Sequence, residues 1–421
     1  MPATPPSLFV RLLRWSEKYT KTDMVYLAKG GFWLTAEQIV IGLTAFGVSI
    51  AFARFVPKSI YGTYRFLLSL FWTLTAFSLT GIPAALNRAV ARNEEGAYRQ
   101  AIPFSLLGSL PMSFIAAGIA AYYLFLGQTI LGYGALAISL GGPFFQAGYL
   151  FASFLAGKKD FRRASLFGIA LSLVPAVTLV TIMPFASTPL SFFIAYLASN
   201  IAIAAVLSMI VFRTYRPNRV MSTEFRNLSW HFSAVNILNT LATQVDQLFV
   251  FHFLGATDLA IYSIATTFPD QMRSMATNLT SLAFPKFVRR SIGEIRQMLW
   301  HRIALITAFA GLGIAIYFFA APFLFHLFYP AYADSIFYSQ LYAFSLVALG
   351  SMIPSTVLQA HAAKRELYAF NITSATVHIT FMLLGILWYG LIGLIGARIL
   401  SRVFNLALGT TLLNRPRRAG S

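Results

Sequence analysis

Residues 33–64 read WLTAEQIVIGLTAFGVSIAFARFVPKSIYGTY. The stretch opens with an apolar run long enough to cross a bilayer, because a membrane-spanning helix needs about 20 mostly apolar residues. A short turn then leads to Tyr64 at the start of a second run. A similar arrangement recurs at 230–262, which read WHFSAVNILNTLATQVDQLFVFHFLGATDLAIY and place Tyr262 in the position of Tyr64. The two stretches predict a membrane protein built from two related halves.

The composition of the whole chain supports this interpretation. Hydrophobic residues make up 57% of the 421 residues and charged residues 11%, whereas a soluble domain carries about 25% charged residues. So few charges could not cover the surface of a soluble fold of this length, so the sequence predicts an all-α integral membrane protein. The chain contains no cysteine, which excludes disulfides, thiolate metal sites and a cysteine nucleophile.

Apolar runs between polar breaks predict about 12 transmembrane helices. Their ranges are 30–54, 61–85, 102–126, 133–157, 164–184, 189–212, 228–253, 260–284, 303–325, 336–360, 367–388 and 391–413. The second stretch begins six runs after the first, an even offset, so the repeat is parallel, with its pseudo-twofold axis along the membrane normal. The predicted units are an N-terminal segment (1–29), two six-helix bundles (30–212 and 228–413) joined by a linker (213–227), and a tail (414–421). The N-terminal segment is cytoplasmic, and its residues 7–19 form either an interfacial helix or a disordered basic tail.

The net charge of +19 is distributed unevenly along this map. Most of the 32 Lys and Arg residues fall before the first run, after every second run and in the tail. The opposite face holds Arg54 and Lys58, with Arg65 just inside the second run. Lys and Arg mark cytoplasmic loops, so we expect both termini in the cytoplasm, in a protein of the inner (cytoplasmic) membrane. Membrane lipids are its surroundings, and the basic charge requires no nucleic-acid partner.

Polar residues inside the predicted spans are the candidate functional residues, because an ionisable group at the bilayer centre costs at least about 2.5–3.5 kcal/mol on insertion scales. The run at 228–253 carries a stripe at three- and four-residue spacing, which places it on one helix face. This stripe comprises Asn236, Asn239, Thr240, Thr243, Asp246 and Gln247. It is either a cavity wall that hydrogen-bonds a polar ligand or a hydrogen-bonded seam between helices.

Three arginines lie deep in the predicted spans. Arg273 follows Asp270 at a spacing that allows the two to pair along the helix, which leaves either a self-neutralised pair or an arginine available to an anionic ligand. Arg398 and Arg402 lie four residues apart on the last span. Two cations at this spacing require a nearby negative charge. Either Glu37, Asp246 or Asp270 supplies it, or an anionic ligand does.

Two further charges lie in the first half. Arg65 either binds an anion or extends to the outer headgroups. Glu37 lies in the inner half of the first span, where it either couples protonation to transport or forms a fixed salt bridge. His231 and His378 stand alone on apolar helices, and we interpret them as buried histidines with satisfied hydrogen bonds. We expect no metal and no cofactor.

Several segments resemble one known family. They are ARFVPKSIYGTYRFLLSL (53–70), LTGIPAALNRAVARNEEG (79–96), FLGATDLAIYSIATTFPDQM (253–272), LFYPAYADS (327–335), LYAFSLVALGSMIPSTVLQAHAAKRELY (341–368) and YGLIGLIGARILSRVFN (389–405). Together they are similar to polysaccharide transporters of the O-antigen flippase type, in the multidrug/oligosaccharidyl-lipid/polysaccharide exporter superfamily. The resemblance covers nearly the whole chain through diffuse patterns.

The resemblance implies two six-helix bundles in a V around a central cavity. This cavity is lined largely by the first, second, seventh and eighth predicted helices (30–54, 61–85, 228–253 and 260–284). It also implies a flippase that moves a polyprenyl-diphosphate-linked oligosaccharide, a precursor of a cell-surface polysaccharide, to the outer leaflet by alternating access. Polysaccharide polymerase or assembly proteins are its candidate partners. On this hypothesis the substrate-binding residues are Arg273, Arg398, Arg402, Arg65, Asn236, Asn239, Thr243 and Gln247. Glu37, Asp246 and Asp270 serve in coupling or in salt bridges.

Two other classes of protein compete with this interpretation. An exporter of a drug or of another lipid would share the topology and differ in the polarity of its cavity. A multi-span polymerase or glycosyltransferase would need a sizeable outer loop or an acidic pair at a loop–membrane border, and the predicted outer loops are about a dozen residues or shorter. We therefore expect no catalytic residues. The chain shows no nucleotide-binding motif, so an ion gradient or the supply and withdrawal of substrate would drive transport.

Overall fold

A computed structural model describes residues 24–281, 292–351, 357 and 364–414, and every regular element in this part of the chain is helical. The first-half elements are α2 (Met24–Phe55), α3 (Lys58–Leu74), η1 (Thr75–Phe77), α4 (Ile82–Ala91), α5 (Gly96–Gly108), α6 (Leu110–Phe125), α7 (Thr129–Gly148), α8 (Leu150–Gly157), α9 (Phe161–Ile182) and α10 (Pro189–Tyr215). The second-half elements are α11 (Phe225–Leu254), α12 (Ala256–Ser281), α14 (Ile292–Phe328), η2 (Pro330–Tyr332), α15 (Ser335–Ala343), η3 (Phe344–Ser351) and α17 (Lys364–Asn414).

Seven helical stretches of the described chain are long and apolar enough to cross a membrane, or eight if the bent pair α3–α4 is one span. The helices α11 and α12 are also long, but their polar residues keep them outside this set. Ser335–Gly350 is a shorter apolar stretch. The protein is therefore an all-helical, multi-span membrane protein, and the number of twelve spans in two bundles stays a prediction.

The boundaries differ from the predicted ranges in several places. The first helix begins by Met24, inside the predicted N-terminal segment, and the proposed interfacial helix at 7–19 lies outside the described residues. The linker between the halves is shorter than predicted, since α10 ends at Tyr215 and α11 begins at Phe225. The run predicted at 336–360 is described only in part, as α15, η3 and residue 357.

The prediction of one continuous helix at 61–85 is wrong. The helix α3 gives way to a short 3-10 turn, and Ser78 adopts an extended conformation with φ −96° and ψ 169°. The chain restarts as α4 with Pro83 in its first turn, where proline loses no helical hydrogen bond. The two pieces are bent by 61°. The backbone N–H of Gly81 at the bend donates to Ser233 Oγ of α11 at 2.8 Å.

A second break, in α17, lies where the sequence predicts two separate helices. The two runs predicted at 367–388 and 391–413 form the two arms of α17, which meet at Tyr389 and Gly390 with non-helical backbone angles. Gly390 has φ +56°, a conformation that glycine adopts without strain. The arms approach closely, because a Cβ on Gly385 would lie 2.4 Å from the carbonyl oxygen of Gly393.

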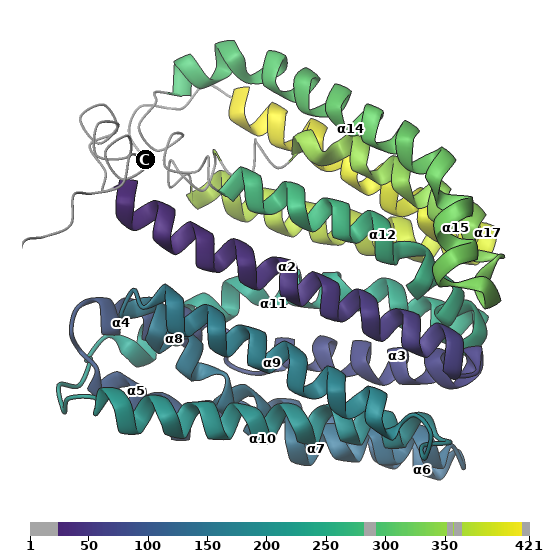
Figure 1. Cartoon of the computed structure of the whole chain (residues 1–421). Coiled ribbons are helices and arrows are strands. Elements are labelled where there is room, and N and C mark those ends of the chain that lie inside the picture. Colours follow the sequence, from purple (N-terminus) through teal and green to yellow (C-terminus); the bar gives the residue numbers. More distant parts are fainter. Residues whose placement is uncertain (1–23, 282–291, 352–356, 358–363, 415–421) are drawn as a thin grey trace, which may run out of the picture.

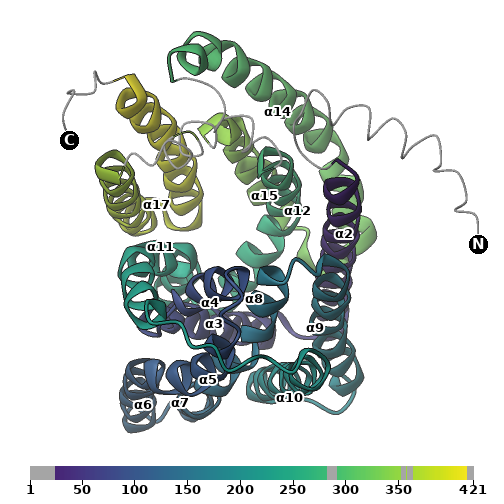
Figure 2. The same cartoon turned by 90° about the vertical axis from the view of Figure 1, so that its left-hand side faces the viewer.

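The helices form two groups that converge at one end of the molecule. Figure 1 shows α5, α6, α7, α9 and α10 in the lower group and α12, α14, α15 and α17 in the upper group. Figure 2 shows α2 beside α9, and α11 beside α3, α4 and α17; α2 also contacts α12 and η2 of the second half, so α2 and α11 lie where the groups meet. The groups converge at the end that holds the α2–α3 turn and diverge toward the end where α2 begins (Figure 1).

The helix α3 contacts the second half without an intervening layer of side chains. A Cβ on Gly62 would lie 1.7 Å from the carbonyl oxygen of Ala256, the first residue of α12. Small residues allow such close approach between helices in membranes. Further along α3, the rings of Phe66 and Phe251 stack with centroids 3.9 Å apart. The converging end of the molecule is therefore tightly packed.

Candidate functional site

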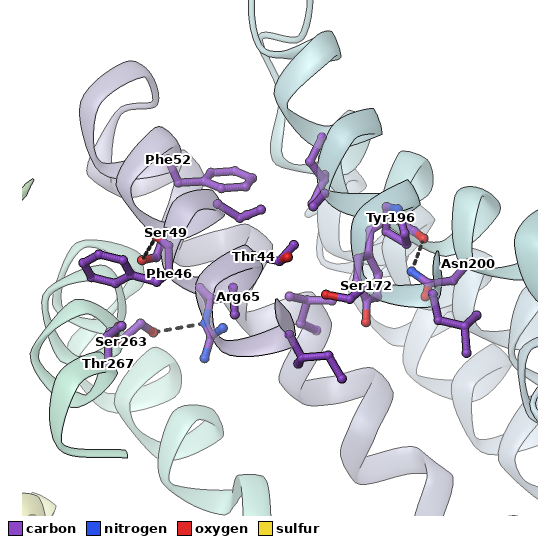
Figure 3. Close-up of a pocket in the computed structure, with 18 of the residues that line it drawn as sticks. Thr44, Phe46, Ser49, Phe52, Arg65, Ser172, Tyr196, Asn200, Ser263 and Thr267 are labelled. Atoms are coloured by element: carbon purple, nitrogen blue, oxygen red, sulfur yellow. Dashed lines mark hydrogen bonds between the residues drawn. The ribbon is translucent and has the colours of Figure 1, made fainter. Parts of the chain in front are cut away.

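A cavity of about 720 Å³ lies between the two groups of helices. Residues of α2, α3, α9 and α10 and Tyr149 line it from the first half, and residues of α12 line it from the second half (Figure 3). No residue of α11 belongs to the described lining of this cavity, and the expectation that α11, the seventh predicted helix, lines a central cavity stays a prediction. The helix α11 lies behind α3, where it packs against α4 and α17.

The two walls of the cavity differ in chemistry. The first-half wall is aromatic and includes Tyr61, Tyr64, Trp72, Tyr149 and Tyr196. The wall formed by α12 is polar and presents Ser263, Thr266, Thr267, Asp270 and Gln271. An apolar wall with a few convergent polar groups is typical of small-molecule sites. Sequence reasoning missed the α9 and α10 residues, because aromatic and small residues on apolar helices resemble packing residues.

Arg65 is the one cation in the described lining (Figure 3). Its Nε donates to Ser263 Oγ at 3.3 Å, and its Nη2 donates to Gln247 Oε1 at 3.2 Å. Both acceptors are neutral, and within the described residues no carboxylate pairs with Arg65. A membrane-embedded cation with only neutral partners is costly. The sequence places Arg65 near the outer end of its span. The structure adds that its guanidinium lies at the cavity.

Glu37 and Asp270 are the acids of the described lining. The Glu37 carboxylate lies over Gly168 of α9, with Oε1 1.8 Å from the position that a Cβ on this glycine would take. Among the described residues Glu37 has no ion pair. Asp270 Oδ1 accepts a hydrogen bond from Tyr342 at 2.7 Å and lies 3.8 Å from Arg402 Nη2. Asp270 thus connects the cavity to charges deeper in the second half.

Arg398 and Asp246 form an ion pair behind the cavity wall. The Arg398 side chain is 14% exposed and the Asp246 side chain 4%. Tyr262 donates to Asp246 Oδ2 at 2.6 Å, and Arg398 Nη1 lies 2.6 Å from the Tyr262 hydroxyl. Sequence reasoning named Asp246 as one of three candidate acids for this arginine. The pair ties α17 to α11 and α12.

Arg402 lies one turn further along α17. Its Nη1 donates to Ser345 Oγ, and its Nη2 lies 3.0 Å from the Tyr342 hydroxyl. Arg273 is close enough to Arg402 and Asp270 to interact with both electrostatically. We call Arg273, Arg398, Arg402, Asp246 and Asp270 the second-half charge cluster. Asp270 is its member in the cavity lining, whereas Arg273, Arg398 and Arg402 are absent from the described lining.

The predicted polar stripe of α11 divides into unlike environments. Asn236 and Thr243 are exposed, Gln247 is half-buried, and Asp246 is buried. The apolar Leu238 is exposed as well, so exposure is not confined to the polar face. The side chain of Asn239 lies outside the described residues. The roles of Asn236, Asn239 and Thr243 in binding stay predictions.

Three polar contacts join the halves where they converge. Ser49 Oγ lies 2.6 Å from the Tyr329 hydroxyl, Arg54 donates to the carbonyl oxygen of Leu327 at 2.6 Å, and Lys58 Nζ lies 3.3 Å from Asp334 Oδ2. The sequence identified Arg54 and Lys58 only as basic residues of the sparsely charged face. Their partners, Leu327 and Asp334, belong to the second half and could not be assigned from spacing along the chain.

The interpretation of the two histidines holds in part, because His378 is half-buried with its Nδ1 2.8 Å from Ser401 Oγ, whereas His231 is exposed. Across the described part of the chain, no group of three or more His, Asp or Glu residues could hold a metal ion.

Comparison with solved structures places the fold in a known class. The chain is 15% identical to an inward-facing multidrug resistance MATE family transporter of the MOP superfamily, with a TM-score of 0.65 over 89% of this chain and 94% of the other. An outward-facing structure of the same description gives 16% identity and a TM-score of 0.54 over 91% and 94%. A MOP superfamily transporter from Pyrococcus furiosus, whose binding pocket is described as reversed in polarity, gives 15% identity and 0.53 over 93% and 95%.

Sequence comparison identifies the family. No curated protein matches the chain significantly. A family model described as polysaccharide biosynthesis protein matches residues 27–269, more than half of the chain. This match covers the cavity-lining residues of the first half and the part of α12 up to Pro269, and it leaves out Asp270 and Gln271. The chain therefore belongs to the polysaccharide biosynthesis protein family and has the fold of the MATE transporters of the MOP superfamily.

Proposed function

We propose that this protein is a flippase that translocates a polyprenyl-diphosphate-linked oligosaccharide across the cytoplasmic membrane by alternating access. The observation that carries the proposal is Arg65, a cation at a cavity between two bundles whose described partners are all neutral. A guanidinium matches the geometry of phosphate oxygens and binds them through paired hydrogen bonds. The family match links the chain to polysaccharide synthesis, and the fold is that of transporters rather than enzymes.

The cavity suits the polar part of such a substrate. Its volume of about 720 Å³ lies within the range of about 300–1,000 Å³ typical of small-molecule sites. The aromatic wall offers ring faces to sugars, and Thr266, Thr267 and Gln271 offer hydrogen-bonding groups to hydroxyls. The second-half charge cluster contains three arginines behind this wall and two acids, of which Asp270 lines the cavity and Asp246 does not. We propose that this excess of positive charge also favours an anionic substrate.

Exporting a cationic drug is the second candidate function. It is favoured by one observation, namely that Glu37 and Asp270 outnumber Arg65 in the described lining. A strain that lacks the gene distinguishes the two. The flippase proposal predicts that lipid-linked sugars accumulate on the cytoplasmic side and that drug sensitivity stays unchanged. Increased sensitivity to cationic drugs with no such accumulation would favour the exporter.

We further propose that both termini are cytoplasmic and that the cavity opens to the cytoplasm in this conformation. The helices diverge toward the end where α2 begins (Figure 1). The fold is also more similar to the inward-facing than to the outward-facing MATE structure, with TM-scores of 0.65 and 0.54.

Cysteine labelling in intact cells tests the proposed orientation, because the chain has no native cysteine. A membrane-impermeant maleimide is expected to label single cysteines at Gly127, Thr188 and Ala331, in the turns at the converging end. Cysteines at Arg92 and Lys159, at the other end, are expected to react only after the cells are permeabilised. Labelling of either cytoplasmic position from outside, at a level equal to Thr188, would contradict the orientation.

A further inference from the structure

Arg65 performs two tasks that compete with each other. It belongs to α3 of the first half and lies at the cavity. The same guanidinium also reaches across to the second half, where it donates to Ser263 of α12 and Gln247 of α11. We call these two hydrogen bonds the Arg65 tie. A group that holds the halves together and faces the binding cavity can respond directly to a ligand.

The acceptors of the Arg65 tie are well positioned but weak. Ser263 is 4% exposed. The Gln247 amide nitrogen donates to Gln244 Oε1 at 3.1 Å, which directs Gln247 Oε1 toward Arg65. The bonds to Arg65 are long, at 3.3 and 3.2 Å, whereas bonds between ionised donors and acceptors are about 2.7–2.9 Å and roughly twice as strong as neutral ones. A phosphate group would therefore be a better acceptor than either side chain.

Two of the three other polar contacts at the converging end are exposed, and the third is buried but uncharged. The hydrogen bond from Arg54 to Leu327 and the ion pair between Lys58 and Asp334 are exposed, and exposed ion pairs contribute little to stability. Ser49 and Tyr329 form a neutral hydrogen bond. The Arg65 tie is thus the partly buried, charge-assisted contact among them, and its loss would weaken the closed end more than the loss of an exposed pair.

We propose that the anionic group of the substrate replaces Ser263 and Gln247 as the hydrogen-bond acceptor of the Arg65 N–H groups. This exchange releases the second half and permits the converging end to open. The inference rests on the proposed function, since it assumes a diphosphate in the cavity. Free phosphate groups would compete for the same N–H groups, but a prenyl chain adds apolar contact with the membrane. The exchange makes opening depend on the presence of substrate.

The exchange has a thermodynamic counterpart. If anion binding weakens the Arg65 tie, removal of the tie must strengthen anion binding by the same factor. A hydrogen bond to a charged group corresponds to about tenfold in affinity. The double variant Gln247→Leu/Ser263→Ala is therefore expected to bind a diphosphate about tenfold more tightly than the parent protein. The isosteric variant Gln247→Glu supplies a permanent anionic acceptor and is expected to bind at least about tenfold more weakly.

Distance measurements between spin labels test the proposal. Cysteines at Gln128 and Tyr389 place labels on the two halves at the converging end, and the chain has no other cysteine. The full-length protein is studied in lipid nanodiscs with farnesyl diphosphate as the probe and farnesol and inorganic pyrophosphate as the comparisons. Thr178→Val/Thr181→Val is the matched control, because these exposed hydroxyls bond only to carbonyls of their own helix.

In the parent protein, farnesyl diphosphate is expected to shift part of the population to longer distances, and farnesol is not. The double variant is expected to show the longer distances without probe, and Gln247→Glu is expected to stay short with probe. Unchanged distances and affinity in the double variant, or a Gln247→Glu protein that opens normally, would overturn the switch. Binding of the probe to the parent without any change in distance would also overturn it while leaving the proposed function intact. Failure of the probe to bind at all would overturn both.

Discussion

Replacing Arg65 with alanine is expected to reduce export of the lipid-linked oligosaccharide at least about 100-fold. This factor corresponds to the loss of two charge-assisted hydrogen bonds to the substrate. The protein is expected to accumulate in the membrane at its normal level, since the bonds that Arg65 makes to Ser263 and Gln247 are long and their acceptors are neutral. Arg65→Lys keeps the charge but loses the planar donor fork, so we expect an intermediate loss of about tenfold.

The measurement is the amount of polysaccharide at the cell surface, normalised to the amount of the variant in the membrane. Arg54→Ala is the matched control, because Arg54 is a basic residue of the same region that lies outside the cavity lining and bonds to an exposed carbonyl. Normal export by Arg65→Ala at normal abundance would show that this arginine does not hold the substrate.

Removing one partner of the Arg398–Asp246 pair is expected to destabilise the protein by about 3–5 kcal/mol, the usual cost of an uncompensated buried charge. Arg398→Ala leaves Asp246 in a site where its side chain is 4% exposed. We expect the amount of protein in the membrane to fall sharply and the midpoint of thermal unfolding in detergent to drop. The double variant Asp246→Leu/Arg398→Met removes both charges and is expected to recover most of the loss.

This experiment also separates two roles for the deep arginines. If Arg398, Arg402 and Arg273 hold the pyrophosphate, as the sequence suggested, their alanine variants should be abundant but unable to export. Arg92→Ala serves as the control for ion-pair loss, because Arg92 and Glu224 pair at an exposed site where about 1 kcal/mol or less is expected. An Arg398→Ala protein with normal abundance and no export would refute a structural role for the pair.

The sequence predicts the positions of most helices, because hydrophobic runs record the thickness of the bilayer directly. It does not predict the bend at Gly81, where Gly81 and Pro83 interrupt an otherwise apolar run. At the bend Gly81 donates a hydrogen bond to Ser233 of α11, a contact between helices that no local pattern contains. Local signals thus locate spans better than they locate breaks within spans.

The sequence predicts which charged residues lie in the membrane but not which of them line the cavity. The sequence identified Arg65, Glu37 and Asp270 as membrane-embedded charges, and all three line the cavity. It could not distinguish them from Arg398 and Asp246, which are equally unusual in composition but pair with each other behind the wall. It also did not identify Tyr196 or Asn200 as lining residues. Whether a helix face meets a cavity or another helix depends on tertiary packing rather than on periodicity.

The pairing of Asp246 with Arg398 has a consequence for how the protein is made. The two residues are 152 positions apart, so at about 5–20 residues per second the ribosome adds Arg398 roughly 8–30 s after Asp246. During this interval the acid enters the membrane without the arginine that later neutralises it. Arg398 and Arg402 occupy the second arm of α17, which joins the first arm through Tyr389 and Gly390. The final hairpin is therefore the step of biosynthesis that supplies the charge partner of Asp246 and completes the second half.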